Sequence, residues 1–211
     1  MRVERENAIL AWHFLPSDGR LQHKHNGSRG QRVEPGDILH VDPPLEICIW
    51  GLHASRRAID ALEYAPGAIV CRVACWGEIQ EEQDDKLCAE YREVLWLADC
   101  DHELHEFACV ITSQLLDLFE SQGERVHPMS RHAIDVKRLW IKGEATDKDL
   151  ATARSSAWDA ARDVAWDAAR SAARIAARSS RWDGGRYAAM AAQNMILQQI
   201  LFALAPQDAA K

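Results

Sequence analysis

The residues best suited to holding a nucleotide stand in the first third of the chain. His13 is the strongly polar residue of the apolar run Asn7 to Leu15, and His53 lies in the segment GLHAS. Imidazole can donate hydrogen bonds to both hydroxyl and phosphate oxygens near neutral pH. Arg56 starts a predicted helix, whose free N–H groups could add phosphate contacts. The alternative interpretation is a pair of partly buried, hydrogen-bonded histidines beside a solvated basic turn. The candidate pocket comprises His13, His53, Ser55, Arg56 and Tyr64.

A second set of candidate residues lies in the alanine-rich stretch after residue 150. Arginines recur there every eight residues from Arg154 onward, and three tryptophans follow the same period. Trp and Arg are favoured anchors of protein interfaces. They also stack on bases, but interleaved aspartates such as Asp159 and Asp163 would repel phosphates. The pattern therefore favours a protein partner over nucleic acid. The candidate partner-binding residues are Trp158, Arg162, Trp166, Arg170, Arg174 and Trp182.

Cysteines and histidines give no convincing metal site. Cys100, His102, His105 and Cys109 are possible ligand types, but Cys100 and Cys109 fall about 180° apart on a continuous helix. The pair His23-x-His25 in a polar loop is a weak metal signal. We therefore expect no metal. No CxxC pair occurs, and a chain of this length does not need disulfides to hold its fold. The six cysteines are expected to be buried free thiols.

Composition narrows the class of protein. Hydrophobic residues make up 47% and charged residues 27% of 211, which is ordinary for a globular chain, and the net charge is −7. An acidic protein is a poor general binder of phosphate backbones. We expect neither a signal peptide nor a membrane span, because the apolar runs are short or interrupted. A cytoplasmic location follows as an expectation.

Local patterns predict the elements of the N-terminal part. We expect a central strand at Asn7 to Leu15, short strands at Ile38 to Val41 and Leu45 to Trp50, and a strand over AIVCRVACW at 68–76. A helix from Ser55 to Tyr64 is predicted between the last two of these strands, with Ser55 as its N-cap.

Helical spacing dominates the rest of the chain. It predicts helices at Lys86 to Leu97, from about Asp99 to Phe119, and at Met129 to Lys142. Thr146 and Asp149 resemble a capping box that opens a long Ala-rich helix. We expect that helix to stop at a Gly184-Gly185 turn, and the apolar segment 186–205 to return against it.

The predicted fold class is α+β. A small mixed N-terminal sheet with helices is followed by an all-helical C-terminal half with a long Ala-rich helix and a returning apolar helix. The expected domains are a mixed α/β unit at 1–98, connecting helices at 99–145, and an Ala/Trp/Arg-rich helical hairpin at 146–211. The long helix exceeds its partner, so part of it would stay uncovered or be covered by the front domain or by a second protomer.

The segments AWHFLP, GLHAS, DALEYAPG, CRVACWGEI and DDKLCAEYR resemble an uncharacterised family of phage and bacterial proteins. The Ala-Trp-Ala-Ala-Arg runs of the tail are similar to immunity proteins of bacterial toxin systems. This resemblance implies a role in phage–host or toxin–immunity conflict, without implying an activity.

A second resemblance concerns the ADP-ribosyltransferase fold. A strand bearing His13, a Gly-aliphatic-aromatic turn in which His53 replaces the more usual Tyr, and a helix ending at Tyr64 are similar to its NAD-binding core. The histidine pair looks more like the RNA 2′-phosphotransferase branch. The catalytic glutamate of typical transferases has no clear match, and Glu78, Glu93 and Glu106 are candidates only by elimination.

Two functions from different classes follow. The leading hypothesis is a cytoplasmic protein-binding module of phage or mobile-element origin, acting as an inhibitor, immunity or anti-defence protein without a cofactor. The competing hypothesis is an ADP-ribosyltransferase-like enzyme or nucleotide-binding protein that uses NAD or a related nucleotide around His13 and His53. The catalytic residues are unknown, and the sequence leaves open whether the protein is an enzyme.

Overall fold

A computed structural model describes residues 7–21, 30–82, 85–157 and 182–206, with the side chains of 182–190 excepted. The chain divides into two compact units. The first comprises Met1–Asp101 together with Met190–Lys211, and the second comprises His102–Ala189. The end of the chain thus belongs with its beginning.

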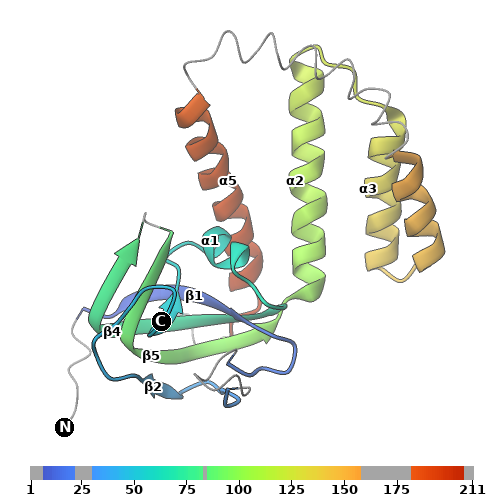
Figure 1. The fold of residues 1–211 in the computed structure, drawn as a ribbon. Coiled ribbons are helices and arrows are strands. Elements are labelled where there is room, and N and C mark those ends of the chain that lie inside the picture. The colour runs from blue at the N-terminus through green and yellow to red at the C-terminus, as the bar shows by residue number, and fades with distance from the viewer. Residues whose placement is uncertain (1–6, 22–29, 83–84, 158–181, 207–211) are drawn as a thin grey trace. The chain divides into compact units, whose positions relative to one another are not determined.

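The first unit is built around a long hairpin of two 14-residue strands, β4 (Ile69–Glu82) and β5 (Lys86–Asp99) (Figure 1). Strand β1 (Ile9–Leu15) pairs with β4, while β2 (Ile38–His40) and β3 (Leu52–Ala54) pair with β5. The five strands form one sheet, and every one of these pairings is antiparallel. Two register shifts along the hairpin mark bulges, which increase the twist of a sheet.

A single backbone bridge joins β1 to the residue that follows β3. Ser55, directly after β3, exchanges two backbone hydrogen bonds with Trp12 of β1, at N···O distances of 2.7 and 2.9 Å. Since β1 pairs with β4, β4 with β5 and β5 with β3, this bridge closes a ring of strand pairings. Residues of β1 and β3, far apart in sequence, are thereby brought together.

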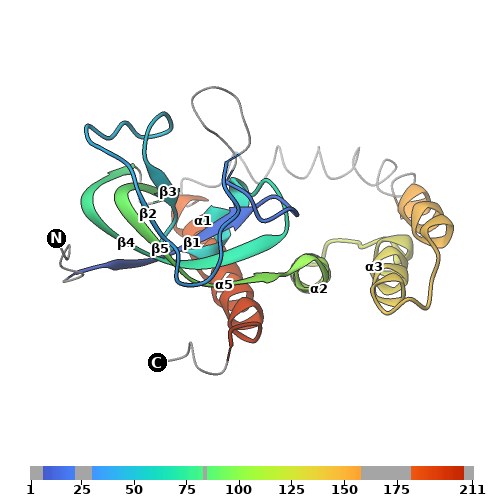
Figure 2. The ribbon, with the colours of Figure 1, turned by 90° about the horizontal axis from the view of Figure 1, so that it is seen from below.

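Residues 190–202 of helix α5 (Trp182–Phe202), which belong to the first unit, pack on one face of this sheet (Figure 2). Leu197 and Leu201 are fully buried, and the ring of Phe202 lies 5.0 Å from that of Trp12. Asn194 accepts a hydrogen bond from the backbone N–H of Ile59 in the short helix α1 (Ala58–Glu63). The other face of the sheet carries the apolar core, in which Leu39 and Leu52 pack against β4 and β5.

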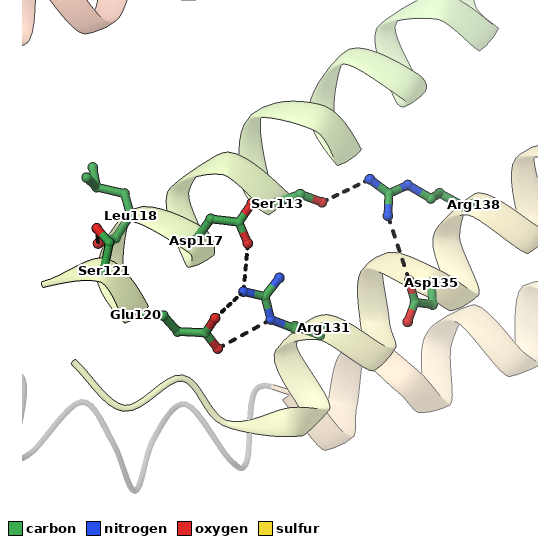
Figure 3. A network of polar contacts seen from close by, with 8 residues as sticks. All are labelled: Ser113, Asp117, Leu118, Glu120, Ser121, Arg131, Asp135 and Arg138. Carbon is green, nitrogen blue, oxygen red and sulfur yellow. Dashed lines mark hydrogen bonds and ion pairs between the residues drawn. The ribbon is translucent and has the colours of Figure 1, made fainter. Parts of the chain in front are cut away.

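The second unit contains helices α2 (Asp101–Ser121), whose first residue belongs to the other unit, and α3 (Pro128–Ile141). Arg131 of α3 binds Asp117 and Glu120 of α2, and Arg138 donates to Ser113 (Figure 3). A further helix runs from residue 147 through residue 157. Pro128 at the start of α3 suits the first helical turn, where its missing N–H is not needed.

The structure confirms several local predictions in this unit. The helices expected near 99–119 and 129–142 are present as α2 and α3. The capping box is also confirmed, because the Thr146 N–H donates to Asp149 and the Asp149 N–H donates to Thr146 Oγ1. Cys109 is buried, as expected of a core residue.

The predicted fold class is wrong in two respects. The sheet is antiparallel rather than mixed. The all-helical C-terminal half is wrong in part, because the residues from Met190 onward belong to the first unit and pack on its sheet instead of completing a separate helical half. Long-range burial of the apolar side of α5 decides this placement, and no local pattern reports it.

The largest single error concerns residues 86–97, which form strand β5 instead of a helix. Leu87, Tyr91 and Val94 happen to have helical spacing, but Arg92, Val94 and Trp96 alternate with less buried neighbours as in a strand. Pairing with the 14 residues of β4 outweighs the local preference.

Four smaller predictions are also wrong. Leu45 to Trp50 forms a turn closed by a Glu46–Trp50 bridge, not a strand. Helix α1 begins after Arg57, so Ser55 is not its N-cap. Strand β1 ends the β1-β4-β5-β2 path rather than lying at its centre. Helix α5 continues through Gly184 and Gly185 without a turn.

Residues 158–181, which make up most of the predicted long Ala-rich helix, lie outside the described part, so the predicted hairpin at 146–211 is described only at 146–157 and 182–206. Among the helices that the structure describes, none has both the length and the apolar character needed to cross a membrane.

Candidate functional site

Strand register gathers a polar cluster on the face of the sheet opposite α5. His13 of β1 lies directly across from Cys71 of β4, and Arg92 of β5 lies across from Cys75. Residues 71 and 75 share one face of β4, because side chains alternate along a strand. His13 and Arg92 therefore point to the same side of the sheet. We call His13, His53 and Arg92 the histidine–arginine cluster.

His53 joins this cluster from β3. It pairs with Cys88, which lies on the same side of β5 as Arg92. The backbone carbonyl of His53 accepts a hydrogen bond from Nη1 of Arg92. The cluster thus draws on three strands whose residues are distant in the sequence.

Arg92 is the most deeply buried charged group of the cluster, with 3% of its surface exposed. Its bond to His53 is its one hydrogen bond to a residue that the structure describes, and its Nε is buried without a partner there. Burial lowers the pKa of the guanidinium from its usual value. The group nevertheless stays charged, since arginine does not lose its proton in proteins.

His13 is a neutral imidazole beside this charge. Burial lowers its pKa well below the usual value, and the charges of Arg92 and His53 lower it further. The residue is only partly buried. Within the described part of the chain, no hydrogen bond engages its ring, so His13 keeps both a donor and an acceptor for a ligand.

The ring of His53 is hydrogen-bonded to the turn that precedes β3. Its Nε2 accepts from the backbone N–H of Cys48 at 2.9 Å, so the ring proton resides on Nδ1. Burial is the largest cause that lowers its pKa, with Arg92 next, while a hydrogen bond to the backbone of Gly51 acts in the opposite direction. His53 therefore positions the turn and, through its carbonyl, Arg92.

The thiols around the cluster are not ionised. Burial raises the pKa of Cys71 to about 12 and those of Cys75 and Cys88 to about 11. A thiolate is the reactive form of cysteine, so these groups are poor nucleophiles near neutral pH. Five of the six cysteines are buried and free as predicted, whereas Cys48 is exposed.

The remaining members of the predicted pocket have other partners. Ser55 is buried and bridges to Trp12 through its backbone. Arg56 binds Glu81 in an ion pair, and the hydroxyl of Tyr64 donates to Asp85 at 2.9 Å. The structure therefore brings together His13 and His53 from the predicted set, while Arg56 and Tyr64 are engaged near the tip of the β4–β5 hairpin.

The predicted partner-binding residues cannot be placed in this way. Trp158, Arg162, Trp166, Arg170 and Arg174 lie outside the described residues. Trp182 starts helix α5, but its side chain is not among those described.

Sequence reasoning missed Arg92 because it assigned residues 86–97 to a helix. The alternation of Cys88, Arg92, Val94 and Trp96 with polar or less buried residues was the available signal. A basic residue at an apolar position of a strand marks a group that needs a partner.

Other features of the described chain offer less chemistry. No group of three or more His, Cys, Asp or Glu side chains there is arranged to hold a metal ion. A cavity of about 630 Å³ lies among the helices of the second unit, bounded by Cys109, Leu116, Ile134 and Leu150 among others. Its lining is mostly apolar, which suits packing rather than acid–base chemistry.

Searches against known protein families, curated proteins and solved structures find no match to this chain.

Proposed function

We propose that the first unit binds a nucleotide, with NAD and its relatives as the first class to test, and that His13 contacts it. The observation that carries this proposal is the convergence of His13 and His53 with Arg92 through strand pairing. His13 is partly exposed, neutral and without a hydrogen bond to the described residues, so it is available to a ribose hydroxyl or a phosphate oxygen.

The proposal assigns the two histidines different roles. His13 touches the ligand, whereas His53 keeps the loop before β3 in place through its ring and Arg92 in place through its carbonyl. This division differs from a pair that grips the ligand together. The proposal concerns binding alone, and it gives neither histidine a catalytic role.

Thermal unfolding of the full chain tests the proposal. NAD, ADP-ribose, AMP and adenosine at millimolar concentration are compared with buffer of matched ionic strength. A ligand that binds the native state raises the melting temperature. We expect a rise with at least one nucleotide and its loss in His13→Gln.

His40→Gln is the matched control, because His40 lies in the same unit but stacks on Tyr91 beside Glu90. This variant should keep the response. The proposal fails if no compound in the panel raises the melting temperature, or if His13→Gln responds like the unchanged protein.

Partner binding through the tryptophans of the Ala-rich stretch stays a prediction of the sequence. The structure changes how it should be tested, because truncation before residue 190 would also uncover the face of the sheet where Leu197 and Leu201 are buried. Trp158→Ala and Trp166→Ala in the full chain are therefore the better variants. The free thiols suit a reducing compartment, and we propose the cytoplasm.

A further inference from the structure

We infer that Arg92 is the anion-recognition residue of the first unit, so that its ligand places a compact oxyanion, such as a phosphate group, against the guanidinium. The inference rests on the proposed ligand site but makes a separate claim. It concerns the charge that the ligand must bring, and it assigns that requirement to a residue outside the predicted pocket.

The first step is the shortage of acceptors around Arg92. A guanidinium carries five N–H donors. One of them is used by the carbonyl of His53, and Nε is buried with no acceptor among the described residues. A buried donor without a partner costs free energy, more so when the group is charged. A bound oxyanion would supply the missing acceptors.

The second step is the lack of a compensating charge. No ion pair with a described residue involves Arg92, and the acidic groups that act on it are the thiols of Cys71, Cys75 and Cys88. Those thiols are protonated near neutral pH, since burial raises the pKa of each to about 11 or above. The interior around Arg92 therefore carries a positive charge that nothing in the described chain neutralises.

Three other arginines of the same unit provide a comparison. Arg57 forms a bidentate pair with the buried Asp60, and Arg56 pairs with Glu81. Arg72, on the opposite face of β4, stacks 4.6 Å from the centre of the Trp12 ring and 5.6 Å from that of Phe202. Arg56 and Arg57 each have an anion as compensation, and Arg72 has two aromatic faces although its Nη1 is also buried without a hydrogen bond. Arg92 has neither an anion nor an aromatic face among the described residues.

The third step is the fit between the group and its expected ligand. The planar fork of a guanidinium binds phosphate or carboxylate through two parallel hydrogen bonds. The carbonyl of His53 holds the fork from one side, and the neutral ring of His13 lies close enough for its pKa to be lowered by Arg92. His13 and Arg92 point to the same side of the sheet, so an oxyanion bound to Arg92 would lie on the side that His13 faces.

Calorimetry and thermal unfolding of the full chain test this inference with simple anions. Orthophosphate and pyrophosphate are the probes, acetate tests a carboxylate, and sodium chloride at equal ionic strength controls for screening. We expect orthophosphate or pyrophosphate to raise the melting temperature by about 5–10 °C at concentrations about 100-fold above the dissociation constant.

Two variants separate anion recognition from a structural role. Arg92→Met should lose the response to anions yet melt no lower than the unchanged protein without ligand, because it removes an uncompensated buried charge. Arg72→Met is the matched control. It should melt at a lower temperature, because its stack on Trp12 and Phe202 is lost, and should keep the response.

The outcomes also distinguish this inference from the proposed function. A response to anions that survives in Arg92→Met, or none in the unchanged protein, overturns the inference. If nucleotides still bind and depend on His13, the proposed function stands without it. If Arg92-dependent binding of phosphate is found but no nucleotide or nucleoside adds to it, the inference stands and the nucleotide proposal fails. A response to acetate alone replaces phosphate by carboxylate as the ligand class.

Discussion

In the second unit, Arg131 lies at the surface and binds the carboxylates of Asp117 and Glu120, whereas in the first unit Arg92 lies inside and binds a backbone carbonyl. The first arrangement links α2 to α3 through contacts that water can replace. The second depends on tight strand packing and leaves the Nε–H of Arg92 without an acceptor among the described residues. The ligand site that we propose lies in the first unit, and substitutions there should have larger effects than equivalent ones in the second.

The largest effect is expected from Gly51→Ala, directly before β3. Gly51 has φ +141°, and a Cβ there would collide with Sγ of the buried Cys88 and lie 3.6 Å from Leu45. Backbone strain and overpacking together should lower the free energy of unfolding of the first unit by about 3 kcal/mol or more. Hydrogen exchange of peptides from β3 and β5 measures this locally.

Gly123→Ala in the second unit is its control. Gly123 also has a positive φ of +80°, but no atom lies within 4 Å of its added Cβ. Only the backbone conformation should matter, which costs about 1 kcal/mol. Equal effects of the two substitutions would show that the loop before β3 is not tightly packed against Cys88, and would remove the contrast between the units.

A smaller loss is expected from Asn194→Ala. No side chain near the start of α1 caps that helix, and Asn194 of α5 supplies an acceptor for the N–H of Ile59. Removing a cap of this kind costs about 1–2 kcal/mol. Met195→Ala, at a neighbouring position with 64% exposure, should change little. Urea denaturation, with hydrogen exchange of the α1 amides as the readout, compares the two variants. A similar loss of stability in both would contradict the capping role.

These cases show how far the sequence could predict the structure. Helix α3 and the Thr146–Asp149 capping box depend on residues that are close in the chain, and both were predicted correctly. Strand β5 and the cap from Asn194 depend on partners far away in the sequence. Periodicity reads a local preference, so it could not tell a strand in a long hairpin from a helix.

The candidate site follows the same rule. His13 and His53 were singled out by residue type and by a resemblance, and the pairing of Ser55 with Trp12 then explains why β3 lies beside β1. Arg92 was missed because its burial depends on β4 and β3 together. The different roles of the two histidines depend on a single contact, the Cys48 N–H to His53, which no spacing pattern encodes.

The stability of the first unit should depend on pH through the two histidines. Burial is the main cause of the lowered pKa of both, and nearby Arg92 acts in the same direction. The unfolded chain therefore binds more protons than the folded one as pH falls through about 6.5, so stability falls below that value and levels off once the folded pKa is passed. Each histidine contributes at most about 1.4 kcal/mol per pH unit.

Urea denaturation of the first unit between pH 7.5 and 5.5 measures this slope. His13→Gln should reduce it, because the substituted side chain does not titrate. His53→Gln should also reduce it, but with a lower stability at every pH, since the contact with the N–H of Cys48 is weakened. A slope that is unchanged in both variants would mean that the two imidazoles are not held neutral by the fold.

The smallest effect is expected from Arg131→Ala, a substitution in the second unit. The guanidinium binds two carboxylates at 2.6 and 2.8 Å, and these hydrogen bonds raise its pKa. All three side chains are exposed, so water and salt compete with the network. The urea midpoint of the second unit should shift slightly in 50 mM salt and still less in 1 M NaCl, where the Debye length is about 3 Å.

The urea midpoint of Arg131→Lys should fall between those of the unchanged protein and Arg131→Ala, because lysine keeps the charge and loses the planar fork. A loss as large as that of Asn194→Ala, or one that persists in 1 M NaCl, would mean that a surface ion network holds α2 to α3 as firmly as buried contacts hold the first unit.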